Sequence, residues 1–153
     1  MAKYATFREL IVWQKGMDLA EAVHRATESL PKIDLWTLGS QIRRAASSIP
    51  SNVAEGFSRR SARAYRAHVA IALGSQAEVQ TLLELSARLS LIERDAVERL
   101  QELAVEVGKL LNGLWRALAA AAVCYSVALL VAFLGLLPGA WGLIFHGLSF
   151  FTK

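Results

Sequence analysis

The chain has 153 residues, of which 54% are hydrophobic, and its formal net charge is +4 at pH 7. This composition excludes a disordered chain, and the single cysteine excludes an intramolecular disulfide and a cysteine-based zinc site. Charge is divided unevenly, because residues 117–152 contain no Asp, Glu, Lys or Arg, whereas residues 1–116 hold all 13 acidic residues. We therefore predict a folded domain over residues 1–113 and a hydrophobic tail over residues 114–153.

Apolar residues recur at helical spacing through the first part, and no stretch alternates for long with the period of a strand. The spacing predicts helices over residues 7–29, 35–56 and 59–89, and a fourth that begins near Asp95. Pro50 predicts a kink or a local break in the second helix, and Gly56 marks its expected end. Ser58 is the candidate N-cap of the third helix. Four amphipathic helices with short connections predict an all-α fold, an antiparallel up-and-down four-helix bundle with an apolar C-terminal helical tail.

Basic charge is concentrated at the junction of the second and third predicted helices. Residues 43–66 hold six arginines against Glu55 alone, whereas residues 67–113 have a net charge of −3. Guanidinium groups near a helix N-terminus suit a phosphate, which favours an anionic partner such as nucleic acid. The alternatives are a solvated basic face and salt bridges to the acidic fourth helix. The candidate nucleic-acid-binding residues are Arg43, Arg44, Arg59, Arg60, Arg63 and Arg66.

A polar line accompanies the apolar stripe of the second helix and suits hydrogen bonds across helices or across a subunit interface. It consists of Gln41, Arg44, Ser48, Asn52 and Glu55. Catalysis would need a nucleophile beside a base or two paired carboxylates, and the serines here have no histidine near them in the sequence. The three histidines of the chain share no metal-ligand spacing. We therefore expect no enzymatic activity, no metal and no cofactor.

Several single residues are interpreted as structural. Gly74, followed by Ser75, suits a close approach between helices, and Trp13, Trp36 and Trp115 suit core or interface anchors. Stacking on a nucleic-acid base is the alternative for an exposed tryptophan or for Tyr65. The predicted structural or interface residues are Trp13, Gln41, Ser48, Pro50, Asn52, Glu55, Gly56 and Gly74.

The sequence resembles a known four-helix-bundle family along residues 7–113. The opening FRELIVWQK at 7–15 and, above all, SQIRRAASSIPSNVAEG at 40–56 match that family's motifs, followed by RRS at 59–61 and ALGS at 72–75. The family includes proteins encoded by intervening sequences in bacterial 23S ribosomal RNA and accessory proteins of diversity-generating retroelements. Two residues depart from the family pattern. Trp36 stands where the family usually has a smaller or hydroxylated residue, and Gln76 stands where leucine is common.

The resemblance implies an antiparallel four-helix bundle that assembles into a ring-like homopentamer without catalytic activity. In the retroelement branch it implies a basic surface that binds structured RNA and a reverse transcriptase. Our first functional hypothesis is accordingly a cytoplasmic, non-enzymatic oligomeric scaffold for nucleic acid and a reverse transcriptase or ribonucleoprotein partner.

The tail carries a second hypothesis, a membrane-anchored oligomeric adaptor or effector. Residues 117–137 are uncharged and as a helix would span roughly 30 Å, the thickness of a bilayer core. Arg116 and the basic domain precede them, so the positive-inside rule would keep the domain in the cytoplasm, anchored to the inner membrane. The alternatives are an extension of the fourth helix buried in an oligomer, a soluble hairpin, and an appended segment without function.

Overall fold

The computed structural model describes residues 5–59 and 61–136, with side chains as far as residue 120. Every regular element in this part of the chain is helical, which confirms the predicted all-α class. The four long helices are α1 (Ile11–Ala26), α3 (Ser40–Ser58), α4 (Ala62–Arg88) and α5 (Arg94–Leu136). Three short elements accompany them: the 3-10 turn η1 (Phe7–Glu9), α2 (Lys32–Asp34) and the π-helical turn η2 (Leu35–Gly39).

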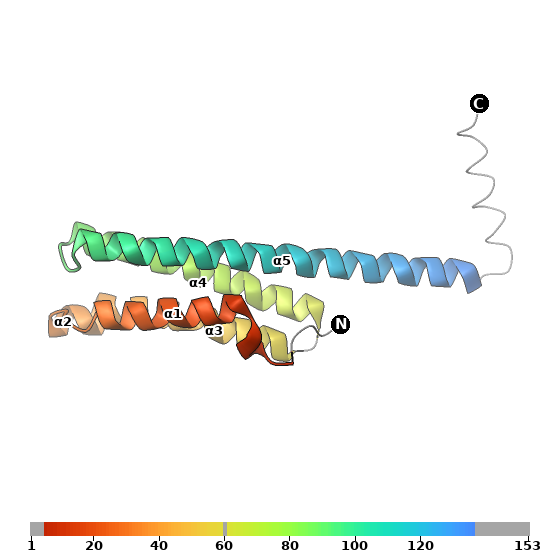
Figure 1. The fold of residues 1–153 in the computed structure, drawn as a ribbon, viewed down its shortest axis with the longest axis horizontal. Coiled ribbons are helices and arrows are strands. Elements are labelled where there is room, and N and C mark those ends of the chain that lie inside the picture. Colours follow the sequence, from red (N-terminus) through yellow and green to blue (C-terminus); the bar gives the residue numbers. More distant parts are fainter. Residues whose placement is uncertain (1–4, 60, 137–153) are drawn as a thin grey trace, which may run out of the picture.

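The four long helices lie side by side, and each contacts two neighbours. Helix α1 packs on α3 and α5, and α4 packs on the same two helices, so the contacts form a closed circuit. Figure 1 shows that successive long helices run in opposite directions. The predicted apolar stripes fill the space between them, because one face of each amphipathic helix is removed from water. The largest fully buried apolar side chains are Leu19, Val23, Ile42, Ile49, Val53, Val69, Val79, Leu83, Val97, Val107 and Leu111.

The first two predicted helices differ from the observed ones at their ends. Leu10 adopts an extended conformation (φ −76°, ψ 121°), which separates η1 from α1. The chain is then helical from Lys32 to Ser58, and α3 continues unbroken through Pro50. The local break predicted at Pro50 is therefore wrong. Next to the proline, a side chain donates a hydrogen bond to a backbone carbonyl of the preceding turn: Ser51 Oγ donates to the Ser47 carbonyl (2.8 Å).

The boundary between α3 and α4 lies later than the sequence pattern predicts. Gly56 does not end α3, because it is buried inside the contact with α4. Ser58 is the last residue of α3, where its Oγ donates to the Ala54 carbonyl (2.9 Å). Ser61 is the N-cap of α4, and its Oγ accepts the Ala64 N–H at 3.4 Å. The prediction of Ser58 as the cap is wrong, because α3 extends two residues beyond its predicted end.

Helix α5 is much longer than its partners and extends past the ends of α3 and α4 (Figure 1). Residues 137–153 lie outside the described residues. Most side chains of the membrane span predicted at 117–137 also lie outside the described part, because side chains are described only as far as residue 120. Within the part whose side chains are described, no helix combines the length and apolar character needed to cross a membrane.

Candidate functional site

The five described arginines of the predicted nucleic-acid surface do not form one patch. Arg43 is used inside the bundle, because its Nε donates to Thr27 Oγ1 (2.7 Å) and a terminal nitrogen donates to the His24 carbonyl (3.2 Å). These bonds satisfy groups at the C-terminal end of α1, where carbonyls lack helical partners. Arg43 therefore joins α1 to α3, and the nucleic-acid contact predicted for it stays a prediction.

The remaining arginines of α3 are separated along the helix. Arg44 is exposed near the start of α3, whereas Arg59 follows its last residue, about 22 Å away at 1.5 Å per residue. The Arg59 guanidinium pairs with the carboxylate of Glu55, one turn earlier. Arg60 lies outside the described residues. The junction predicted from residue counts therefore separates into two ends of the bundle.

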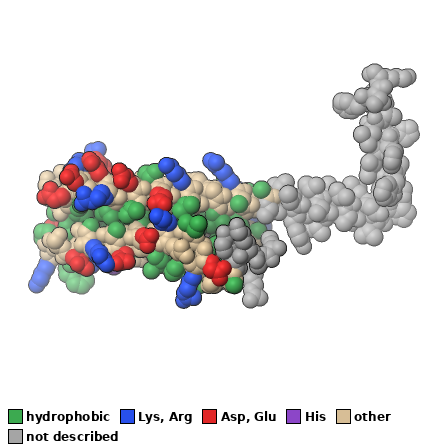
Figure 2. Space-filling view, in the orientation of Figure 1, with side chains coloured by type: hydrophobic (Ala, Val, Ile, Leu, Met, Phe, Trp, Pro, Cys, Tyr) green, Lys and Arg blue, Asp and Glu red, His purple; other side chains and the backbone are tan. Residues whose placement is uncertain are grey.

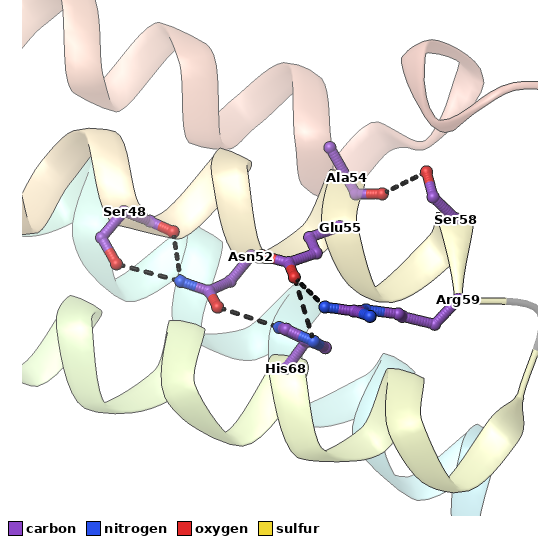
Figure 3. Close-up of polar contacts among 7 residues, drawn as sticks. All are labelled: Ser48, Asn52, Ala54, Glu55, Ser58, Arg59 and His68. Carbon is purple, nitrogen blue, oxygen red and sulfur yellow. Dashed lines mark hydrogen bonds and ion pairs between the residues drawn. The ribbon is translucent and has the colours of Figure 1, made fainter.

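The polar line of α3 meets α4 in a network of hydrogen bonds (Figure 3). Asn52 Nδ2 donates to the Ser48 carbonyl (2.9 Å) and to Ser48 Oγ (3.0 Å), and Ser48 Oγ lies 2.8 Å from Ser75 Oγ on α4. Asn52 Oδ1 faces His68 Nδ1 at 3.2 Å. Three side chains of the line, Ser48, Asn52 and Glu55, thus reach α4, while Gln41 and Arg44 are exposed.

His68 was not predicted in this network, because it lies 16 residues from Asn52 on another helix. Since Asn52 Nδ2 donates to Ser48, its Oδ1 must accept, and we assign the donor hydrogen to His68 Nδ1. His68 Nε2 then faces Glu55 Oε1 at 3.7 Å. The hydrogen bond from Arg59, followed by the charge of His68, lowers the pKa of Glu55. Asn52 stands between Ser48 and His68, so the network joins helices rather than a nucleophile to a base.

Two glycines singled out in the sequence have opposite environments. A Cβ added to Gly56 would lie 2.5 Å from Tyr65 Cδ2 and 2.9 Å from His68 Cβ, so glycine allows α3 and α4 to approach closely. A Cβ added to Gly74 would meet nothing within 4 Å. The interpretation of Gly74 as a close-approach residue is therefore wrong for contacts within this chain, where the neighbouring Ser75 makes the contact.

Two hollows lie along the outer edge between α4 and α5. Near the start of α4, the Arg66 guanidinium carbon lies 4.0 Å from the centre of the Trp115 ring, which is a cation–π contact. The first hollow is lined by Ala62, Arg63, Arg66, Ala67, Ala70, Trp115 and Leu118. The second lies farther along the same pair of helices and is lined by Gln76, Val105, Gly108, Lys109, Asn112, Gly113 and Arg116.

The residues that line these two hollows carry positive charge only. They include four Lys or Arg residues and no Asp or Glu, whereas Glu102 and Glu106 line a neighbouring hollow together with Lys109. None of the four forms an ion pair with a residue of the described part of the chain. In the view of Figure 2, more acidic side chains lie toward the left end of the bundle, while others lie at mid-length and at the right end. We call this surface the basic groove, defined by Arg63, Arg66, Lys109, Trp115 and Arg116.

Comparison with known proteins agrees with the motif at 40–56. The profile of the 23S rRNA-intervening sequence protein family matches residues 8–113, about two thirds of the chain. The chain belongs to the 23S rRNA-intervening sequence protein family. A similar solved structure is the crystal structure of a protein of unknown function from the S23 ribosomal protein family of Bacteroides thetaiotaomicron. It is 25% identical, with a TM-score of 0.65 over 69% of this chain and 96% of that one. No curated protein matches.

In this member of the 23S rRNA-intervening sequence protein family, some residues of the basic groove lie inside the region matched by the family and others lie just after it. Arg63, Arg66 and Lys109 lie within the matched residues, whereas Trp115 and Arg116 follow directly after them. The sequence interpretation missed the contribution of α5 because Lys109 falls in a region of net negative charge. The sequence feature that indicates this basic stretch of α5 is the absence of any Asp or Glu after Glu106.

Tyr65 provides a prediction about the packing beside Gly56. Its hydroxyl is buried without a hydrogen-bond partner among the described residues, and burial raises its pKa to about 12 from 10.0. The contribution of this neutral hydroxyl to the free energy of unfolding is therefore fully present below pH 10. It is lost as the pH rises through about 12, where the folded protein ionises Tyr65. We expect Tyr65→Phe to stabilise the protein by about 1 kcal/mol at pH 7 and to remove this alkaline loss. Urea unfolding at pH 7 and pH 11 measures both, and a less stable Phe variant at pH 7 would contradict the prediction.

Proposed function

We propose that this protein is a non-enzymatic scaffold that binds structured RNA through the basic groove. The supporting observation is that Arg63, Arg66, Lys109 and Arg116 line two hollows between α4 and α5 whose lining residues include no Asp or Glu. Phosphate oxygens are the natural partners of such a surface, because guanidinium and ammonium groups release the counterions of a nucleic acid when they bind. The groove, rather than the arginines of residues 43–60, is the contact surface in this proposal.

The scaffold is proposed to be a cytoplasmic homo-oligomer, a pentamer in the arrangement that the family resemblance implies. The outer face of α1 and α3 supports self-association, because it leaves the apolar side chain of Met17 44% exposed. A shallow apolar groove on this face is lined by Trp13, Met17, Ala20, His24, Pro50 and Ala54, among others. A reverse transcriptase or another ribonucleoprotein component is the proposed protein partner, on the same resemblance.

RNA binding by the full-length chain tests the proposal. With about four phosphate contacts, the logarithm of the association constant should fall against the logarithm of salt concentration with a slope of about −3 to −4. Fluorescence anisotropy with a labelled RNA hairpin between 50 and 300 mM KCl measures this slope. Absence of salt-sensitive binding would contradict the proposal. Capture of an acidic protein that survives nuclease treatment would assign the groove to protein binding instead.

The alternative function is a membrane-anchored oligomeric adaptor or effector. It is favoured by the uncharged run at 117–137, directly after Arg116. Cell fractionation separates the two proposals, since an anchored protein remains in the membrane pellet after a high-salt wash and needs detergent for release. Recovery of the full-length chain in the supernatant without detergent would contradict anchoring.

A further inference from the structure

We propose that the basic groove selects RNA with an unpaired nucleotide, whose base stacks on the pair formed by Arg66 and Trp115. This inference rests on the proposed RNA binding and specifies which form of RNA the groove prefers. It concerns the end of the groove at Trp115, which lies two residues after the last residue matched by the family.

The pair of Arg66 and Trp115 has the properties of a stacking platform. The guanidinium carbon lies 4.0 Å from the ring centre, and both side chains are only half-buried. Arg66 Nε is enclosed and has no hydrogen-bond partner among the described residues, so the guanidinium is held by the indole and not by a carboxylate. An arginine plane and an aromatic ring are the two kinds of surface on which proteins stack unpaired bases.

The walls around this platform leave room for a base. Ala62, Ala67 and Ala70 form the α4 side of the groove, so no large side chain other than the arginines stands there. On the α5 side, the same hollow is lined only by Trp115 itself and by Leu118. A flat, bulky ligand can therefore enter beside the platform without displacing the helix packing.

Charge on both sides of the platform fits the phosphates that flank such a base. Arg63 is exposed one turn before Arg66, and Arg116 is exposed next to Trp115 in the chain. In a continuous duplex the bases are stacked on one another, so a duplex offers this site its phosphates but no free base face. A bulged or looped nucleotide offers both, which makes the unpaired form the better ligand.

Two RNA hairpins test the inference with the full-length protein. In both, a polyethylene glycol linker replaces the loop nucleotides, so that they differ only by one bulged adenosine and the plain hairpin has no unpaired base. Fluorescence anisotropy at 150 mM KCl should give about tenfold tighter binding to the bulged hairpin, the effect of one stacked base. Equal affinities with steep salt dependence would overturn the inference and leave the proposed RNA binding intact. Absence of salt-dependent binding to either hairpin would overturn both.

Variants of the platform separate stacking from a purely structural contact. Arg66→Lys keeps the charge and a good helix former but removes the planar surface, so it should lose most of the preference for the bulge while still binding the plain hairpin. Trp115→Leu should do the same, and Trp115→Phe should restore part of the preference. Arg44→Lys, on the far end of α3, is the matched control and should keep the full ratio. An unchanged ratio in Arg66→Lys would overturn the inference, even if Trp115→Leu fails to fold.

Discussion

Replacing Arg63, Lys109 and Arg116 together by glutamine is expected to weaken RNA binding by about a hundredfold to a thousandfold at 150 mM salt. Each side chain is exposed in the basic groove, and none pairs with an acidic residue of the described chain. Each therefore loses one charge-assisted contact to phosphate on substitution. The slope of log affinity against log salt should become shallower by about 3. Fluorescence anisotropy over a salt series measures both quantities.

The control for this variant removes the same charge elsewhere. Lys32, Arg44 and Arg99 are exposed outside the groove and form no ion pair with a described residue, so their replacement by glutamine gives an equal net charge. Because charges beyond about 10 Å are screened at this ionic strength, RNA affinity should fall by no more than about threefold. Equal weakening by both triple variants would show that net charge, and not the groove, determines binding.

Gly56→Ala is expected to destabilise the bundle by about 1–3 kcal/mol. The new methyl group would lie 2.5 Å from Tyr65 Cδ2 and 2.9 Å from His68 Cβ. The Tyr65 ring can turn only by disturbing its edge-to-face contact with Phe57, and the His68 Cβ moves only with the α4 backbone. Helices α3 and α4 must therefore separate, which also strains the bonds among Ser48, Asn52 and His68. Thermal unfolding by circular dichroism should show a melting temperature lowered by several degrees, at roughly 2–4 °C per kcal/mol for a chain of this length.

Gly74→Ala is the matched control for this substitution on the same helix pair. The added methyl group meets nothing within 4 Å, and alanine is the better helix former, so we expect stabilisation by about 0.5–1 kcal/mol. Opposite signs for the two glycine variants would support the close approach at Gly56. A Gly56→Ala protein as stable as the native one would contradict the packing described between α3 and α4.

The helical architecture follows from the apolar spacing, and the misplaced boundaries have local causes. Residues such as Ile42, Ile49 and Val53 recur every three to four positions and are all buried, as the stripe predicts. Pro50 and Gly56 are breakers by intrinsic preference, but tertiary contacts with α1 and α4 keep both inside α3. The intrinsic penalty, about 1 kcal/mol for glycine and about 3 kcal/mol for proline, is outweighed by burial of a helix face.

The candidate site is harder to predict than the fold. Counting charged residues along the sequence does not show on which side of a helix each side chain lies. Arg43 and Arg44 are neighbours in the chain, but successive residues of a helix point about 100° apart. One therefore reaches the end of α1 while the other faces water. Conversely, Arg66 and Trp115 are 49 positions apart and touch only because α4 and α5 pack in a particular register. The register comes from the whole core, so no local motif predicts the groove.

Ultraviolet crosslinking of the full-length protein to a bulged RNA hairpin, followed by mass spectrometry of the crosslinked peptides, tests the central claim most directly. If the basic groove is the RNA surface, crosslinks should fall on peptides from residues 62–70 of α4 and 108–118 of α5. They should also disappear in the variant that lacks Arg63, Lys109 and Arg116. Crosslinks concentrated instead around Arg44 and the start of α3, or retained by that variant, would contradict the claim.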